Sequence, residues 1–285
     1  MNSHSGQTIW ITGASSGIGA ALAEAFAAEG AALILSGRRR DALDAVAASL
    51  GGKSLVLPFE TTDWDALPDI VDTAWRWRNG VDVLVNNAGI SQRSLAVDTT
   101  PGVYDTLLDV DLRAPIHLTQ ALLPRMVERR SGTIVMISSV AGRLGPVLRT
   151  GYAAAKHGLI GYADALRAEV ELAYGLRVVN VLPGSVRTAV AANALQADGS
   201  ARGDSDANIE AGMDPAECAR RILAGLAEGK REILVAEGGE AFAAALRWQE
   251  PERLFDMLSA EGKRLAEARA EGKGPEPALV NRTFE

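Results

Sequence analysis

The sequence has very little cysteine and few aromatic residues. Of its 285 residues one is cysteine, Cys218, and only 5% are aromatic. A single cysteine cannot form an intrachain disulfide, which favours a reducing compartment. Cys218 falls in an amphipathic pattern over residues 215–228, so we expect it to lie in the core rather than to react. A chain of this length can bury a large aliphatic core without disulfides or metals.

Further absences exclude whole classes of function. The net charge of −7 argues against general nucleic-acid binding, which needs a basic face to neutralise phosphates. No apolar run approaches the roughly 18 residues of a membrane span. The histidines, His4, His117 and His157, have no metal-ligand spacing among themselves or with Cys218, so we expect no metal site. Residues 1–7 are polar and lead into a strand without a signal-peptide pattern, so we expect a cytoplasmic protein.

Short aliphatic runs alternate with helical patterns along most of the chain. Strands are predicted at Thr8–Thr12, Ala32–Ser36, Ser54–Pro58, Val81–Asn86, Thr133–Ser138, Arg177–Leu182 and Glu232–Val235. Helices are predicted at Gly17–Glu29, Arg40–Leu50, Asp65–Arg78, Val103–Arg130, Gly151–Tyr174 and Pro215–Glu228. Continuous apolar strands separated by helices indicate a parallel sheet covered on both faces. The sequence therefore predicts an α/β fold, a single Rossmann-type doubly wound sheet of about seven strands.

The alternation stops after residue 183. Residues 189–213 are rich in Asp, Ser, Gly and Ala and show no clear period. Residues 239–269 are predicted to be helical with an interruption at Pro251, and a loose tail follows from Gly272. Without an interdomain linker, we expect one catalytic domain over residues 1–238 and a helical C-terminal extension and tail over residues 239–285.

A glycine-rich turn lies between the first predicted strand and the first predicted helix. Glycines let the backbone turn tightly and approach a pyrophosphate, whose charge the helix N-terminus stabilises. On a strand–turn–helix this pattern predicts a dinucleotide site; the alternative is an ordinary connecting turn. The residues assigned to the cofactor here are Gly13, Ser15, Ser16, Gly17, Ile18 and Gly19.

Four further motifs follow in order. They are Asn86-Asn87-Ala88-Gly89; Ser139; the pair Tyr152 and Lys156, in which Tyr152 is thirteen residues after Ser139; and Pro183-Gly184 with Val186 and Thr188. Together with the Gly-x-x-x-Gly-x-Gly turn, they make residues 7–236 resemble the short-chain dehydrogenase/reductase family. Members of this family usually form dimers or tetramers, so the resemblance implies a homodimer or homotetramer.

The pair Tyr152 and Lys156 suits acid–base chemistry. Residues four apart on a helix share a face, about 5–6 Å apart at Cβ. Tyrosine ordinarily ionises near pH ~10, and a nearby ammonium favours the tyrosinate. Lys156 could therefore bring Tyr152 toward the working pH. The alternative is a tyrosine packed on the sheet beside a solvated lysine.

The resemblance implies a role for each motif. Tyr152 exchanges a proton with the substrate oxygen, Ser139 hydrogen-bonds that oxygen, and Lys156 also holds the nicotinamide ribose. The further cofactor contacts that it implies are Asn87, Ala88, Gly89, Pro183, Gly184, the backbone of Val186 and the hydroxyl of Thr188.

The sequence departs from the family pattern at two places. Asp111 replaces the catalytic asparagine of the fourth helix, which in the family sits where that helix is distorted. We assign Asp111 to the catalytic group. Its carboxylate could pair with Lys156, raising the pKa of that lysine and disfavouring the tyrosinate, or it could only bind local backbone amides. After the third strand, Glu60-Thr61 stands in for the family's Asp-Val beside the adenine, and both are assigned to the cofactor.

The end of the second strand indicates which nicotinamide cofactor is used. NAD-selective sites place an acidic residue there for the ribose hydroxyl. This chain has Gly37 followed by Arg38, Arg39 and Arg40. A guanidinium matches a 2′-phosphate in charge and in bidentate geometry. We assign Gly37, Arg38 and Arg39 to the cofactor, take Arg40 as a solvated helix start, and expect NADPH to be preferred over NADH.

These features predict an NADP(H)-dependent oxidoreductase that interconverts a carbonyl and an alcohol. The alternative is an NADP-binding sensor or scaffold in which Asp111 has weakened catalysis. Residues 189–213 occupy the position of the family's substrate lid. The residues expected near the substrate are Val190 and Leu195 of this lid, Leu144, Val147 and Leu148, and Arg93 and Arg143 at the rim. They suit an apolar or amphipathic small-molecule carbonyl compound or alcohol, with room for an anionic group.

Overall fold

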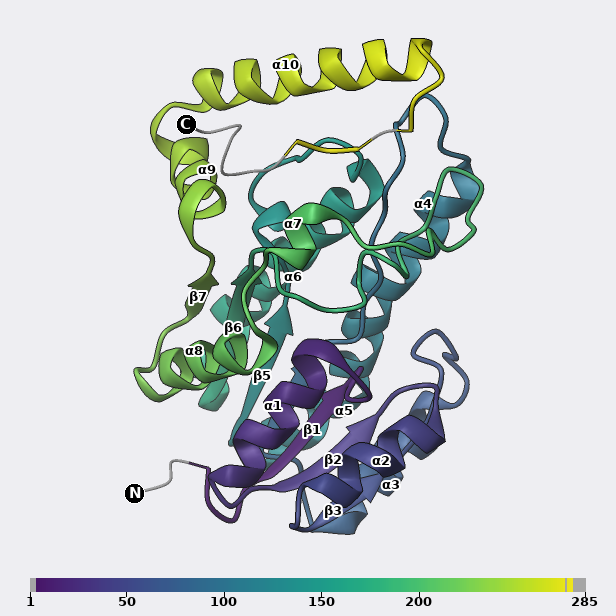
Figure 1. Ribbon diagram of the computed structural model, residues 1–285. Coiled ribbons are helices and arrows are strands. Elements are labelled where there is room, and N and C mark those ends of the chain that lie inside the picture. The colour runs from purple at the N-terminus through teal and green to yellow at the C-terminus, as the bar shows by residue number, and fades with distance from the viewer. Residues whose placement is uncertain (1–3, 275, 279–285) are drawn as a thin grey trace.

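Seven parallel strands form the centre of the protein, which the computed structural model describes over residues 4–274 and 276–278 (Figure 1). Their order in the sheet is β3-β2-β1-β4-β5-β6-β7. The strands are β1 (Thr8–Thr12), β2 (Ala32–Ser36), β3 (Ser54–Val56), β4 (Val83–Asn86), β5 (Gly132–Ile137), β6 (Leu176–Pro183) and β7 (Glu232–Val235). The chain reverses direction across the sheet between β1 and β4, where a crevice opens at the carboxyl ends of the strands.

Helices cover both faces of the sheet, so the predicted doubly wound α/β fold is confirmed. One face carries α1 (Gly17–Ala28), α2 (Arg40–Ser49) and α8 (Pro215–Ala227). The other carries α3 (Leu67–Trp77), α5 (Ala114–Arg129) and α6 (Thr150–Tyr174).

Strand β1 shows why the sheet is buried on both sides. Side chains alternate across a strand, so Ile9 and Ile11 pack toward one helix layer and Trp10 toward the other. Trp10 is fully buried, and its indole Nε1–H donates to Ser36 Oγ at 2.9 Å, which satisfies its polar group. Cys218 also lies in this core, as predicted, and burial raises the pKa of its thiol to about 12.

The prediction of one continuous α-helix over Val103–Arg130 is wrong at Asp109–Arg113. The structure has α4 (Pro101–Leu108), a π-helical turn over Asp109–Arg113, and then α5. Pro115 explains the change, because it has no N–H to donate to the carbonyl of Asp111 four residues earlier. Instead the N–H of Ala114 bonds the carbonyl of Asp109, five residues back. Such π-turns are frequent at functional sites.

The last helices lie across the carboxyl end of the sheet (Figure 1). Helices α9 (Gly238–Gln249) and α10 (Pro251–Ala270) meet at Pro251, where the sequence predicted the interruption. A third apolar cluster joins them to the loop after β5; its buried members are Leu144, Ala243, Ala244, Leu246 and Leu254. Among the described residues, no helix has the length and apolar content that crossing a membrane requires.

Candidate active site

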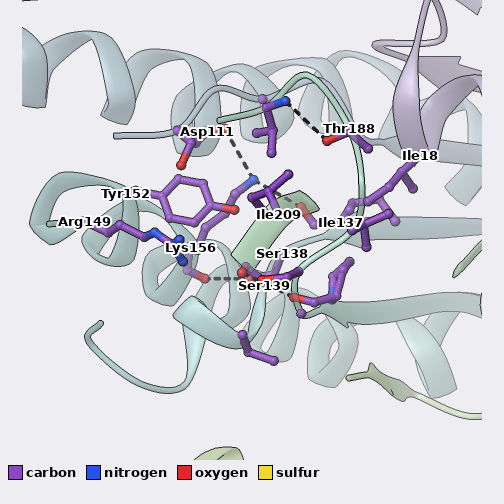
Figure 2. A pocket seen from close by; sticks show the side chains of 18 of the residues that line it. Ile18, Asp111, Ile137, Ser138, Ser139, Arg149, Tyr152, Lys156, Thr188 and Ile209 are labelled. Atoms are coloured by element: carbon purple, nitrogen blue, oxygen red, sulfur yellow. Dashed lines mark hydrogen bonds and ion pairs between the residues drawn. The ribbon is translucent and has the colours of Figure 1, made fainter. Parts of the chain in front are cut away.

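A cavity of about 130 Å³ opens at the carboxyl ends of β4, β5 and β6. Ser139, Tyr152, Lys156 and Asp111, which the sequence assigned to catalysis, all line it (Figure 2). Its wall also includes Gly89 and the loop after β6. The cavity therefore lies beside the crevice where parallel sheets of this type bind their ligands.

Ser139 is fixed at the end of β5 by its own local bonds. It precedes a short 3-10 turn over Val140–Gly142, and its Oγ accepts a hydrogen bond from the N–H of Ala141 at 3.1 Å. The hydroxyl donates to the carbonyl of Pro183 at 3.4 Å, a long bond. A substrate oxygen could replace the Pro183 carbonyl as the acceptor, because only a weak hydrogen bond would be lost.

Tyr152 and Lys156 lie one turn apart near the start of α6. The ammonium Nζ of Lys156 is 5.6 Å from the centroid of the Tyr152 ring, so both groups share one face of the helix. Lys156 is 4% exposed, and its Nζ donates to the carbonyl of Ile137 at 3.2 Å. The remaining donors of this buried ammonium can reach Asp111 and a bound ligand.

Asp111 forms an ion pair with Lys156, which is the first of the two arrangements expected from the sequence. The distance between Asp111 Oδ1 and Lys156 Nζ is 3.3 Å. The second arrangement is present as well, because Oδ1 also accepts from the N–H of Ile90 at 3.1 Å. Asp111 is fully buried, and its Oδ2 has no hydrogen-bond partner in the part of the chain that the structure describes.

The two groups of this pair shift each other's ionisation. Burial alone would lower the pKa of Lys156, but the charge of Asp111, with smaller contributions from Tyr152 and the hydrogen bond, raises it above its ordinary value. Burial raises the pKa of Asp111, although Lys156 and the N–H of Ile90 oppose this shift. The carboxylate therefore holds the proton on the lysine more firmly than a neutral amide would.

The predicted dinucleotide turn has the close approaches that its glycines imply. Gly13 adopts a left-handed φ of 65°, and a Cβ there would lie 2.8 Å from the Cα of Ala88. A Cβ at Gly19 would collide with the carbonyl of Gly13. Thr12 Oγ1 accepts from the N–H groups of Asn87 and Ala88, both at 3.0 Å. The glycine turn and the loop after β4 thus form one rigid cradle that fits a dinucleotide.

The arginines assigned to the cofactor lie at the edge of this cradle. Gly37 follows β2, and a Cβ there would be 3.8 Å from Ser15 Oγ. Arg38 and Arg39 are exposed, and the nearest carboxylate to Arg38 is Glu60, 3.8 Å away. Both guanidinium groups follow Gly37 directly in the chain and are accessible to a ligand. Of the other assigned residues, Ser16 precedes α1, Ile18 and Asn87 line the active-site cavity, and Thr61 lines a small cavity with Ala88.

The loop after β6 closes the opposite side of the site. Pro183, Gly184, Val186 and Thr188 line the active-site cavity. A Cβ at Gly17 would lie 3.0 Å from the methyl group of Thr188, so this loop also approaches the glycine turn.

Two residues that position the site were missed from the sequence. Glu240 of α9 accepts from the N–H of Ser185 at 2.6 Å and from the Ser185 hydroxyl at 2.7 Å. Gln92 is fully buried, and its Oε1 accepts from the N–H groups of Gly151 at 2.8 Å and Tyr152 at 3.4 Å. Gln92 thereby caps the first turn of α6, which carries Tyr152. Only the tertiary fold brings these partners together, so no local motif marks them.

The expectations for the substrate pocket need correction. Val190 lines the active-site cavity as expected, whereas the backbone of Leu195 pairs with the loop after β4. Arg93 lines the cavity, but its side chain is buried and paired with Asp206 at 2.7 Å. Arg143 does not line the cavity, because it pairs with Glu232.

Leu144 and Val147 line a second cavity, which Leu148 does not. The arginine that faces both cavities is Arg149, which was not predicted to lie near the substrate.

Comparison with known proteins agrees with this geometry. Residues 7–199 match the family described as short chain dehydrogenase. The chain is 36% identical over 263 residues to dehydrogenase/reductase SDR family member 7B of Bos taurus, covering 89% of this chain and 81% of that protein.

Solved structures show the same architecture. The short-chain dehydrogenase from Sphingobium yanoikuyae in complex with NADPH matches with a TM-score of 0.72 and 28% identity, covering 90% of this chain and 96% of that one. A short chain dehydrogenase/reductase from Burkholderia phymatum in complex with NAD matches with a TM-score of 0.75 over 98% and 99% of the two chains; at 21% identity it supports the fold alone. With its site residues in place and a family match over residues 7–199, this chain belongs to the short-chain dehydrogenase/reductase family.

Proposed function

We propose that the protein is an NADP(H)-dependent oxidoreductase that interconverts a carbonyl and an alcohol. The observation that carries the proposal is the convergence of Ser139, Tyr152 and Lys156 on one cavity beside a dinucleotide cradle. Membership of the family supports the general part of this proposal, namely an oxidoreductase that acts on small molecules with a nicotinamide cofactor.

In the reduction of a carbonyl, each of these side chains has a separate role. When bound, the nicotinamide supplies the hydride to the carbonyl carbon. The Tyr152 hydroxyl donates its proton to the carbonyl oxygen, and the Ser139 hydroxyl donates a hydrogen bond to the same oxygen as negative charge develops there. The ammonium of Lys156, 5.6 Å from the Tyr152 ring, stabilises the resulting tyrosinate. Oxidation of an alcohol uses the same groups in reverse.

The proposed preference for NADP rests on the residues after β2. Arg38 and Arg39 are exposed directly after Gly37, and no acidic residue occupies the end of the strand. The Sphingobium yanoikuyae structure, which contains NADPH, supports this choice. The Burkholderia phymatum structure contains NAD, so the fold alone does not decide between the two cofactors.

Asp111 favours one rival function, an NADP-binding sensor with weakened catalysis. The test is NADPH consumption with a panel of ketones, aldehydes and quinones, together with Tyr152→Phe. We expect turnover by the wild-type protein and a loss of about 10²- to 10⁴-fold in Tyr152→Phe, with NADPH affinity nearly unchanged. NADPH binding without turnover of any compound would favour the sensor. Retained turnover in Tyr152→Phe would mean that another group supplies the proton.

A further inference from the structure

One charged side chain of the active-site cavity, that of Arg149, has neither a hydrogen-bond nor an ion-pair partner among the described residues. Arg149 is half-buried and lies three residues before Tyr152, and Figure 2 shows its side chain beside the Tyr152 ring. Its guanidinium makes no hydrogen bond or ion pair with any residue in 4–274 or 276–278.

The other charges that face this cavity are satisfied within the protein. Lys156 pairs with Asp111 at 3.3 Å, and Arg93 pairs with Asp206 at 2.7 Å. The carboxylate of Glu240 accepts two hydrogen bonds from Ser185 and forms no ion pair with Arg149. Arg149 is close enough to Asp206 for its charge to lower the pKa of that carboxyl, but Asp206 is already paired with Arg93. The guanidinium of Arg149 is therefore the positive group of this cavity that is left for a ligand to bind.

The backbone that delivers Arg149 to the cavity is unusual. Leu148 has a left-handed φ of 65°, which a non-glycine residue seldom adopts. Its side chain is 3% exposed, and its carbonyl accepts from the N–H of Ser94 at 3.1 Å. Packing and hydrogen bonding thus hold a conformation that costs energy, and such residues cluster at functional sites.

A second, largely apolar cavity of about 70 Å³ adjoins the first. The two cavities share Val140, Arg149 and Glu240. The apolar side chains of the second come from the loop after β5 and from the C-terminal extension, and include Leu144, Val147, Ala243, Leu258 and Ala278. Its polar members near the extension are occupied, since Glu261 binds Arg264 and the N–H of Ala278.

Resting on the proposed oxidoreductase function, we propose that Arg149 selects a carbonyl compound that carries an anionic group and an apolar segment. The guanidinium binds the carboxylate or phosphate, since both accept its paired N–H groups in a plane. The apolar segment occupies the second cavity, where the C-terminal extension excludes water from it. The reacting carbonyl then lies between Ser139 and Tyr152.

The charge requirement is tested with matched acids and esters. The probes are 4-oxodecanoate and its methyl ester, reduced with NADPH by the wild type, by Arg149→Met and by Arg220→Met. The last variant is the control, because Arg220 is exposed on α8 and pairs with Glu217, so it changes net charge by the same amount outside the site. We expect Arg149→Met to lower kcat/KM for the acid by roughly 10- to 100-fold and to change the value for the ester little. Equal losses for acid and ester would overturn the anion site.

The apolar requirement is tested by chain length. We expect wild-type protein to prefer 4-oxodecanoate over 4-oxopentanoate, because each buried methylene favours binding. Val147→Phe, which fills the second cavity, should abolish this preference while 4-oxopentanoate is still reduced. An unchanged chain-length preference in Val147→Phe would contradict the placement of the apolar segment.

A binding measurement separates this proposal from the proposed function. Decanoate and decanol are titrated by calorimetry into the NADP-saturated protein. We expect decanoate to bind more tightly and Arg149→Met to remove the difference, even if no ketone in the panel is turned over. Equal affinity for decanoate and decanol in the wild type would overturn the anion site while leaving the oxidoreductase function to the turnover assay.

Discussion

Asp111 Oδ1 lies 3.3 Å from the ammonium of Lys156, in a pair whose side chains are 0% and 5% exposed. The π-turn that ends at Arg113 brings this carboxylate to the cavity, where the family pattern has an amide. Asp111 thereby adds a negative charge beside the lysine to which we assign stabilisation of the tyrosinate. We therefore expect Asp111 to shift the pH range of the proposed reaction rather than to remove a proton donor.

Replacing Asp111 with asparagine tests this effect. The charge of Asp111 raises the pKa of Lys156, so Asp111→Asn should lower that pKa and ease formation of the tyrosinate. We expect activity to be kept or increased and the pH profile of kcat/KM for alcohol oxidation to move to lower pH. Rate–pH profiles of both proteins, with folding checked by circular dichroism, measure the shift. A large loss of activity with folding intact would instead make the aspartate itself a catalytic residue.

The cofactor preference is tested at Arg38 and Arg39. The double variant Arg38→Asp, Arg39→Ala should weaken NADPH binding by about 3 kcal/mol or more, because charge-assisted contacts to the 2′-phosphate disappear. NADH affinity should change much less. Arg40→Ala is the matched control, since Arg40 is exposed at the first position of α2. Fluorescence titration with both cofactors decides the matter, and equal losses for NADPH and NADH would show that the 2′-phosphate is bound elsewhere.

Much of the fold could be predicted because its signals are local. The predicted strands in the middle of the sheet are aliphatic runs that the structure buries from both sides, as in β1, and the glycine turn and the Tyr152–Lys156 spacing are short motifs. The family resemblance places Asp111 where its helix is distorted, but the π-turn itself was not predicted, because its cause, Pro115, lies inside an otherwise continuous helical pattern. A proline there predicts a disturbance but not its geometry.

The parts of the site that could not be predicted depend on contacts between distant residues. Glu240 and Ser185 are 55 positions apart, Gln92 and Gly151 are 59 apart, and Arg93 and Asp206 are 113 apart. Arg143 was expected at the pocket rim, but Glu232 on β7 draws it away. No periodicity relates such positions, and only the packed sheet with its C-terminal extension makes them neighbours.

We expect the buried ion pair between Arg93 and Asp206 to stabilise the segment of residues 189–213, which contains Asp206. Burial and the charge of Arg149 lower the pKa of Arg93 to about 10 despite Asp206. The pKa of Asp206 is lowered, against the effect of burial, by Arg93, by the N–H of Ile209 and by the charge of Arg149. Both groups are therefore charged at neutral pH. Asp206→Asn leaves the buried Arg93 without its negatively charged partner and should reduce the free energy of unfolding by about 3 kcal/mol.

The sign of the pH dependence follows from Asp206. Its pKa in the folded protein is below 3.8, so its contribution is fully present above that pH and is lost as the pH falls through the folded value. The difference between wild type and Asp206→Asn should hold near neutral pH and close in acid. Urea unfolding across this range measures it, with Glu228→Gln of an exposed pair as a control expected to change stability by less than about 1 kcal/mol. A difference independent of pH would show that Asp206 acts by packing alone.

Glu240 links the C-terminal extension to the loop after β6, which we assign to the cofactor. Its carboxylate holds both the N–H and the hydroxyl of Ser185, the residue between Gly184 and Val186, and a Cβ at Gly184 would collide with it. In Glu240→Gln the amide oxygen can still accept, but the NH₂ group faces the second donor, so the loop loses a charge-assisted bond. We expect NADPH affinity to fall by about tenfold, since such bonds contribute about 1.5–3 kcal/mol and part of this is recovered by the amide.

The control for this variant is Glu252→Gln, at an exposed position in the first turn of α10. It removes the same charge from the same extension without touching the loop after β6, so NADPH affinity should stay at the wild-type value. Titration of NADPH and the Tm of each apoprotein are measured together, because a residue that only docks α9 would lower Tm and leave the cofactor affinity unchanged. A loss of affinity confined to Glu240→Gln would make the extension part of the cofactor site, with Glu240 as its positioning residue.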